Sequence, residues 1–482
     1  MSVRRRWKRT RLGLAAAVVA TAPLLLGSTA ADPVVTGPVT GGNGHILLQA
    51  TNFPLDSAGY TQSEFFVSGT AASFTPAADL GPDGRWQVSP AATAPYTTRI
   101  VVNRPVDPAR FNGTVVVEWL NVSAGLDVAP DWIYAHNELI REGYAWVGVS
   151  SQAVGVSADK AGDPARYASL SHPGDSYSYD IFSQAGQAVR GSAATVLGGL
   201  RPRAVLAEGE SQSAFRLTTY LNAVQPLAHV YDGFLVHSRG GGSAPLSQAP
   251  QADVPTPPVV PFRTDLDVPV LAVQTETDLV ALGYLAARQD DSARVRIWEV
   301  AGTAHADDYV ANLGAGDDGS GETGVRELAA MLDPPAGTPG FTCDRPINTG
   351  QAHYVVDAAQ YALNRWVTAG VPPARASRLQ VTTTGSFVLD AHGNVKGGVR
   401  TPAVDVPVAT LSGLGQAGSS FCFLFGTTTP FDAPALSALY PTHAHFVARW
   451  AAGTTSAVTA GFLRPADGIE LVRAALETRV GG

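Results

Sequence analysis

The chain of 482 residues is poor in charged residues, in cysteine and in long hydrophobic runs. Charged side chains make up 15% of it, and the formal net charge of −8 is spread without long runs of one sign. This distribution gives no electrostatic reason to expect a polyanionic partner, which argues against nucleic acid. Hydrophobic residues, at 45%, are numerous enough to build a substantial core. We therefore expect a globular protein.

The one notable apolar run lies near the N-terminus. Six basic residues at positions 4–11 precede the run LGLAAAVVATAPLLLG, and small residues follow it at 28–31. This order is typical of a secretory signal peptide, here with cleavage near Ala30 or Ala31. The run falls short of the ~20 residues that a membrane-spanning helix needs, and an uncleaved anchor is the alternative. We predict a signal peptide over 1–31 and a secreted mature protein without stable membrane insertion.

Cysteine occurs only twice, at Cys343 and Cys422. An even number in an oxidising compartment favours a disulfide between the two, which would close a loop of about 80 residues. Such a bond would contribute up to ~4 kcal/mol by restricting the unfolded chain. Two separate buried thiols are the alternative interpretation, because the sequence alone fixes no geometry.

Short apolar segments alternate with turn-forming residues along the mature chain. The first three of these segments, rich in β-branched residues, predict neighbouring strands at 63–74, 96–105 and 113–121. From residue 130 onward, segments with helical spacing alternate with strands, which is typical of βαβ units. We predict an α/β fold with a mainly parallel central sheet, helices on both of its faces and an antiparallel N-terminal edge.

We expect residues 32–482 to form a single domain, with a core at about 60–330. The region at about 340–482 shows two helical patterns and a hairpin pattern and no separating linker, so we expect it to pack on the sheet as an extension. A Pro- and Gly-rich loop at 239–267 is too long for a plain connection, and such loops often wall a site. The acidic loop at 313–324 matches no calcium-loop spacing, so we expect no metal site.

The stretch Gly209-Glu210-Ser211-Gln212-Ser213 joins a predicted strand directly to a predicted helix. A serine at such a junction is held on a strained turn, with its hydroxyl exposed at the end of the strand. Small residues are needed on either side because strand and helix approach closely there, and Gly209 and Ser213 meet that demand. A similar pattern around Ser176 follows no strand. We therefore predict that Ser211 is a nucleophile.

A serine hydroxyl becomes a good nucleophile only when a base takes its proton, so the hypothesis requires a histidine and an orienting carboxylate. In sheets of this kind the partners follow in the order serine, acid, histidine. The strand at 268–275 ends in a carboxylate cluster that contains Glu276 and Asp278, and the loop after the strand at 293–302 carries His305. We predict a triad of Ser211, His305 and Asp278, with Glu276 as the alternative acid.

Other histidines compete with His305 for the role of base. His237 ends the strand that follows the nucleophile helix and is the main rival. We expect structural or solvated roles for four further histidines, which lie within or at the start of helical patterns: His136, His353, His443 and His445.

The transition state of acyl transfer also needs donors for the developing oxyanion. One should be the backbone N–H of Gln212, directly after the nucleophile at the positive end of its helix. The second should come from the loop after the strand at 113–121, where Asn121 and Val122 stand. Capping of a turn is the alternative role for Asn121.

Several stretches, in chain order, resemble one known family: GTVVVEWLNVSAG, GYAWVGVSSQ, AEGESQSAFRLTTYLNAV, VQTETD, EVAGTAHADDY and VRTPAVDVPVATLSG. The chain resembles an α/β-hydrolase, and more narrowly the secreted bacterial proteins called alpha/beta hydrolase domain proteins, over nearly all of its mature length. The resemblance implies the α/β-hydrolase fold and a serine hydrolase with the triad named above. Ser213 departs from the commoner Gly-x-Ser-x-Gly turn.

The function we expect is a secreted carboxylic-ester hydrolase that acts on a small ester, forms an acyl-enzyme on Ser211 and needs no cofactor. A peptidase or amidase with the same triad is one alternative. A catalytically inactive binding module on the hydrolase scaffold is another, because a fold does not determine function. The sequence gives no prediction of the acyl-chain preference or the oligomeric state.

Overall fold

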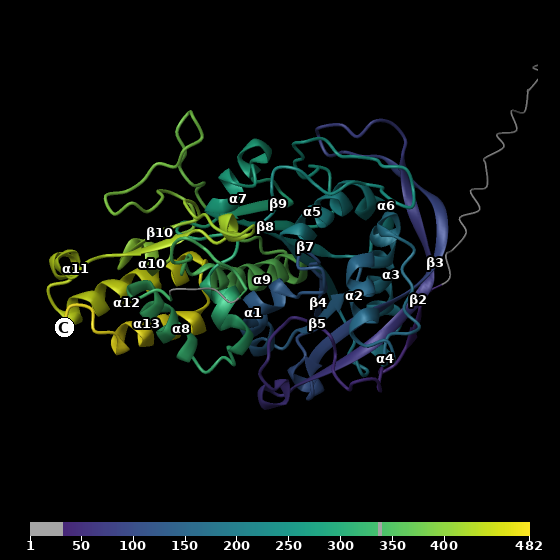
Figure 1. Ribbon diagram of the computed structural model, residues 1–482, viewed down its shortest axis with the longest axis horizontal. Coiled ribbons are helices and arrows are strands. Elements are labelled where there is room, and N and C mark those ends of the chain that lie inside the picture. Colours follow the sequence, from purple (N-terminus) through teal and green to yellow (C-terminus); the bar gives the residue numbers. More distant parts are fainter. Residues whose placement is uncertain (1–31, 336–339) are drawn as a thin grey trace, which may run out of the picture. The chain divides into compact units, whose positions relative to one another are not determined.

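The computed structural model describes residues 32–335 and 340–482, so the predicted signal peptide lies outside the described residues (Figure 1). In this part of the chain the strands are β1 Val34–Thr36, β2 Tyr60–Pro76, β3 Val88–Pro105, β4 Thr114–Trp119, β5 Ala145–Val149, β6 Ala204–Glu210, β7 Gly233–His237, β8 Val270–Gln274, β9 Val295–Glu299, β10 Ala409–Ser412 and β11 Thr427–Pro430. The α-helices are α1 Pro130–Arg141, α2 Ala153–Gly162, α3 Ser178–Gly191, α4 Ala193–Val196, α5 Gln212–Thr219, α6 Gln225–Ala228, α7 Glu276–Val280, α8 Glu322–Leu332, α9 Ala352–Ala369, α10 Pro402–Asp405, α11 Ala433–Leu439, α12 His443–Ala460 and α13 Pro465–Glu477.

A nine-stranded mixed sheet organises the described chain, in the order β1-β2-β3-β5-β4-β6-β7-β8-β9. Strands β1, β2 and β3 pair antiparallel, and β3 pairs antiparallel with β5. From β5 to β9 every pairing is parallel, with Val117 of β4 opposite Val147 of β5 and Ala207 of β6. The predicted mainly parallel sheet with an antiparallel N-terminal edge is therefore confirmed.

The parallel strands are buried along their whole length, because helices cover both faces of the sheet. A charged residue in such a strand needs partners, and Glu118 of β4 has three. Its carboxylate accepts hydrogen bonds from the backbone N–H groups of Asp131 (3.0 Å) and Trp132 (2.9 Å) at the start of α1, and from the indole N–H of Trp146 (2.9 Å). Glu118 thus ties the N-terminus of α1 to the sheet.

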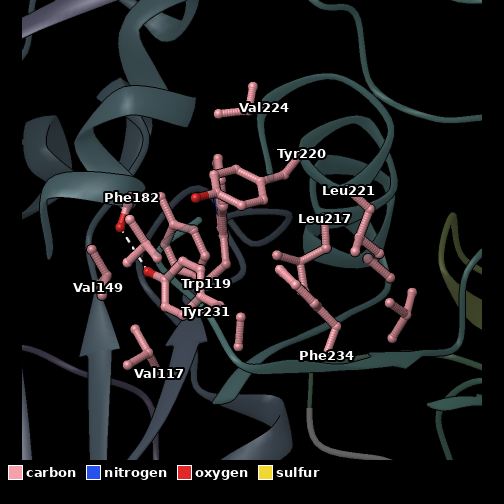
Figure 2. Packing of buried hydrophobic residues seen from close by; sticks show 14 of the residues in the cluster. Val117, Trp119, Val149, Phe182, Leu217, Tyr220, Leu221, Val224, Tyr231 and Phe234 are labelled. Atoms are coloured by element: carbon pink, nitrogen blue, oxygen red, sulfur yellow. Dashed lines mark hydrogen bonds between the residues drawn. The ribbon is translucent and has the colours of Figure 1, made fainter. Parts of the chain in front are cut away.

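Two apolar cores lie on the two faces of the sheet. On one face, the helix α3 and the helical segment 212–228 pack against the strands. Figure 2 shows Trp119 and neighbouring sheet valines facing Phe182, Tyr220 and Tyr231, and the Tyr231 hydroxyl donates a hydrogen bond to the Phe182 carbonyl (2.7 Å). On the other face, α1 and α9 contribute most of the core. The Ser211 segment is therefore supported by a densely packed aromatic layer.

The C-terminal extension packs on the sheet. Helix α9 places Val355 and Leu363 in the second core, beside Leu235 of β7 and Leu271 of β8. Val399 forms a parallel bridge with Val300, directly after β9. The long β2–β3 hairpin lies at one side of Figure 1 and the helices α11, α12 and α13 at the other.

The predicted disulfide between Cys343 and Cys422 is present. It joins two stretches of the extension that also pair through the backbone, since the Ser419 N–H donates to the Thr342 carbonyl (2.9 Å). Of the helices in the described residues, none is long and apolar enough to span a membrane.

Candidate active site

Ser211 occupies a sharp turn between β6 and α5. Its backbone has φ 56° and ψ −119°, in the left-handed region that residues with a Cβ rarely adopt. A Cβ on Gly209 would lie 3.0 Å from the Ser213 Cβ and 3.1 Å from Leu217 Cδ1, so strand and helix are as close as predicted. The turn exposes the Ser211 hydroxyl at the carboxyl end of β6, which is the geometry expected of a nucleophile elbow.

Three predicted side chains, separated by up to 94 positions in sequence, meet at this edge of the sheet. The Ser211 Oγ lies 2.7 Å from His305 Nε2, and His305 Nδ1 lies 2.6 Å from Asp278 Oδ1. Burial lowers the pKa of His305, but the carboxylates of Asp278 and Glu210 outweigh burial and leave that pKa above its usual value. The arrangement is a continuous path for a proton from the hydroxyl to the imidazole.

Asp278 is positioned by the short helix α7. Its second oxygen, Oδ2, accepts a hydrogen bond from the Thr275 N–H (2.7 Å), and the Thr275 hydroxyl accepts one from the Asp278 N–H. Thr277 also positions His305, because its hydroxyl accepts a hydrogen bond from the backbone N–H of His305 (3.1 Å). Both carboxylate oxygens of Asp278 are therefore committed, one to the helix cap and one to His305.

Glu276, the alternative acid, is directed elsewhere. Its two oxygens accept hydrogen bonds from the N–H groups of Gly302 (2.6 Å) and Gly413 (2.8 Å). Burial raises the pKa of Glu276 to about 7, against the lowering effect of these two N–H groups. Glu276 thus links the loop before His305 to the C-terminal extension, and it makes no contact with the imidazole.

Glu210 is a fourth ionisable residue at the site, and no sequence pattern above singles it out. Its Oε1 lies 3.4 Å from His305 Nε2, the nitrogen that also contacts Ser211, and its side chain is 8% exposed. Burial raises the pKa of Glu210 to about 7, while His305 and His237 lower it. The sequence feature that could have indicated Glu210 is its position next to Ser211, at the end of the buried strand β6.

His237, the rival base, lies in the neighbouring strand β7 but does not reach the Ser211 hydroxyl. Its carbonyl accepts a hydrogen bond from the Ser211 N–H (3.0 Å), whereas its imidazole Nδ1 lies 2.8 Å from Asp131 Oδ1. Burial lowers the pKa of His237, and Asp131 more than offsets this, so the pKa is raised. The Tyr134 ring and the imidazole pack edge-to-face. His237 and Asp131 form a buried hydrogen-bonded pair beneath the site.

The remaining competing residues have other partners. Ser176 donates a hydrogen bond to the Gln248 carbonyl in a buried turn. His136 Nε2 contacts the Asp317 carbonyl (2.7 Å), and the His353 ring stacks on Tyr309. His443 and His445 lie in the first turn of α12.

The predicted oxyanion donors differ in availability. Gln212 is the first residue of α5, directly after Ser211. The backbone N–H of Asn121 donates to the Val128 carbonyl (2.9 Å), and its side-chain amide donates to the Glu210 carbonyl (3.2 Å). The Val122 N–H has no acceptor within 32–335 and 340–482. Asn121 therefore holds the loop after β4 against the end of β6, and Val122 is one of the backbone donors of that loop without an acceptor among the described residues.

Two cavities open on Ser211 and His305. One has a volume of about 360 Å3 and is lined in part by Gln212, Arg216 and Phe423. It also includes Ala244 and Pro245, so the long Pro-rich loop does wall the site. The other has a volume of about 280 Å3 and is lined in part by Asn121, Tyr134 and Phe421. In the described ranges, no cluster of three or more His, Cys, Asp or Glu side chains is arranged to hold a metal ion.

A family described as alpha/beta hydrolase domain matches residues 35–473. None of the curated proteins matches the chain. Among solved structures, a lidless α/β serine hydrolase from Xanthomonas campestris is 13% identical, with a TM-score of 0.27 over 48% of this chain and 86% of its own. An arylesterase is 12% identical, with a TM-score of 0.27 over 42% of this chain and 72% of its own. One of two fungal esterases from Rhizomucor miehei is also 12% identical, with a TM-score of 0.26 over 48% of this chain and 74% of its own.

Proposed function

Because the chain belongs to the alpha/beta hydrolase domain family, we propose that it is a secreted serine hydrolase that cleaves carboxylic esters through an acyl-enzyme on Ser211. One observation carries the proposal: the Ser211 hydroxyl, the His305 imidazole and the Asp278 carboxylate form an unbroken chain of hydrogen bonds of 2.7 and 2.6 Å. A serine so placed is activated by its base and needs no cofactor.

The proposed reaction has two halves. Ser211 Oγ attacks the ester carbonyl as its proton passes to His305 Nε2, and the oxyanion is held by the N–H groups of Gln212 and Val122. The imidazolium is stabilised by Asp278 at Nδ1 and by Glu210 beside Nε2. His305 then protonates the leaving alcohol. Water, activated by the same histidine, releases the acid from the acyl-enzyme.

Assays with p-nitrophenyl esters and peptide anilides in parallel test the reaction class. We expect ester hydrolysis with a rapid first burst of p-nitrophenol, and its loss in Ser211→Ala. Cleavage of anilides at comparable kcat/KM would show an amidase instead. Folded protein that hydrolyses neither would support a binding module.

Export is the second part of the proposal. The N-terminal segment and the Cys343–Cys422 disulfide support an oxidising compartment outside the cytoplasm. N-terminal sequencing of the exported protein should find a chain that starts close to Ala31 or Asp32. A chain that keeps its N-terminal segment in the membrane fraction would contradict this.

A further inference from the structure

The two cavities beside Ser211 differ in chemistry. The one of about 280 Å3 has a mainly apolar lining, to which the C-terminal extension contributes Phe341, Phe421, Leu424 and Phe425. We name it the phenylalanine cavity. The one of about 360 Å3 contains Arg216 and Gln212, and we name it the arginine cavity. Since both are open to the same hydroxyl, a substrate bound at Ser211 can extend into either.

We infer that the substrate is an ester with an apolar group on one side, of the size of an aromatic ring or a medium-length chain, which binds in the phenylalanine cavity. This inference rests on the proposed function and adds the chemical class of the substrate to it. The opposite side of the scissile bond then faces the arginine cavity and carries a polar group.

The wall of the phenylalanine cavity is a built aromatic cluster. The Phe341 ring lies 5.2 Å from the Phe425 ring and 6.1 Å from the Phe421 ring, measured between centroids. Phe341 thus contacts both other rings; Phe425 is 6% exposed, whereas Phe421 is 40% exposed. A phenylalanine that faces an open cavity rather than the core gains its hydrophobic free energy only when an apolar group covers it.

The cluster is held at a fixed place beside the catalytic residues. Phe421 precedes Cys422, and the disulfide from Cys422 to Cys343 joins the two stretches of chain that carry Phe421 and Phe341. The Leu424 carbonyl accepts a hydrogen bond from the N–H of Ala306, the residue after His305 (3.1 Å). The wall is therefore tied to the loop that carries the imidazole, as a preformed pocket requires.

The arginine cavity has a mixed lining, in which Arg216 and Gln212 lie beside apolar residues such as Phe215 and Phe423. The Arg216 side chain is 6% exposed and donates from Nη2 to Asp175 (3.0 Å) and Gln248 (3.1 Å). Its Nε and Nη1, and the Oε1 of Gln212, are buried with no hydrogen-bond partner among the described residues. The charged Arg216 and the amide of Gln212 interrupt the apolar lining of this cavity, so the apolar part of the substrate is favoured in the phenylalanine cavity.

The volume sets the size of the apolar group. An apolar protein cavity of about 150 Å3 is known to hold a benzene ring. A cavity of about 280 Å3 therefore has room for one ring with a short chain, or for an unbranched chain of similar bulk.

Chain-length series test the inference. One series varies the acyl group of p-nitrophenyl esters from acetate to decanoate, and the other varies the alcohol of acetate esters from methyl to octyl. In one of the two series, kcat/KM of the wild-type protein should rise about fourfold per added methylene until the cavity is full.

Phe421→Ala and Phe423→Ala form a matched pair, because both residues are exposed phenylalanines of one loop but line different cavities. The quantity compared is the ratio of kcat/KM for the longest favoured ester to that for the shortest, which does not depend on the fraction of folded protein. Phe421→Ala should lower this ratio at least tenfold, Phe421→Leu should restore most of it, and Phe423→Ala should leave it within threefold of wild type.

The outcomes separate this inference from the proposed function. A wild-type ratio near one in both series, or an equal loss in Phe421→Ala and Phe423→Ala, would overturn the phenylalanine cavity as the apolar site while the esterase stands. Absence of hydrolysis of every ester by the wild-type protein would overturn both.

Discussion

The substitution Asp278→Asn tests which carboxylate orients the imidazole of His305. Asp278 Oδ2 accepts the Thr275 N–H at 2.7 Å, and Oδ1 contacts His305 Nδ1 at 2.6 Å. In Asp278→Asn the single remaining oxygen is the only atom that can accept from Thr275, so the NH2 group turns toward His305. The imidazole must then carry its proton on Nε2, where it cannot accept the proton of Ser211.

The expected loss is large. A triad whose imidazole is held in the wrong tautomer loses about 10⁴-fold in kcat, which corresponds to about 5.5 kcal/mol of transition-state stabilisation. Substrate binding needs no change in this variant, so KM should change far less than kcat. The assay is steady-state hydrolysis of a p-nitrophenyl ester, with circular dichroism to confirm that the variant is folded.

Glu276→Gln is the matched control, because it removes the neighbouring buried carboxylate. Its two oxygens each accept one backbone N–H, from Gly302 and Gly413, and a glutamine can serve only one of them. Because burial raises the pKa of Glu276 to about 7, its ionised form is disfavoured in the folded protein above that pH, which offsets the lost hydrogen bond. We therefore expect little change in stability above pH 7 and a nearly unchanged kcat. If Glu276→Gln lost activity and Asp278→Asn kept it within tenfold, the reasoning from the two hydrogen-bond sets would be refuted.

Two further predictions follow from the structure. The double variant Cys343→Ser/Cys422→Ser frees a loop whose ends are 79 residues apart, so its free energy of unfolding should fall by up to about 4.5 kcal/mol; an unchanged urea midpoint would contradict this. Glu210→Gln removes a negative charge that raises the pKa of His305. Since catalysis needs a neutral imidazole, the acid limb of the kcat/KM–pH profile should move to lower pH, and movement to higher pH would contradict the role given to Glu210.

The fold and the convergence of Ser211 and His305 at one edge of the sheet could be predicted because they depend on patterns of short range. Strands of β-branched residues alternate with helical segments, and Ser211, Asp278 and His305 each lie shortly after the end of such a strand. Since the carboxyl ends of parallel strands share one edge of a sheet, these positions were expected to meet there. The small residues around Ser211 gave the same indication independently.

What could not be predicted depends on contacts between distant segments. Glu276 and Asp278 are two residues apart, and only the cap at Thr275 and the contact with Gly413 of the extension distinguish them. Likewise, the sequence does not distinguish Asn121 from Val122 as an oxyanion donor, because the carbonyl that accepts the Asn121 N–H belongs to Val128, seven residues further along the chain. The contact of Glu210 with His305 and the walls of the phenylalanine cavity depend on how side chains pack, which periodicity does not encode.

The central claim is that Ser211 is an activated nucleophile. Incubation of the folded protein with a fluorophosphonate, followed by mass spectrometry of its peptides, measures this directly. We predict a single phosphonyl adduct, located on Ser211, that is absent from Ser211→Ala and strongly slowed in Asp278→Asn. An adduct on a different serine, or folded wild-type protein that stays unlabelled, would contradict the account.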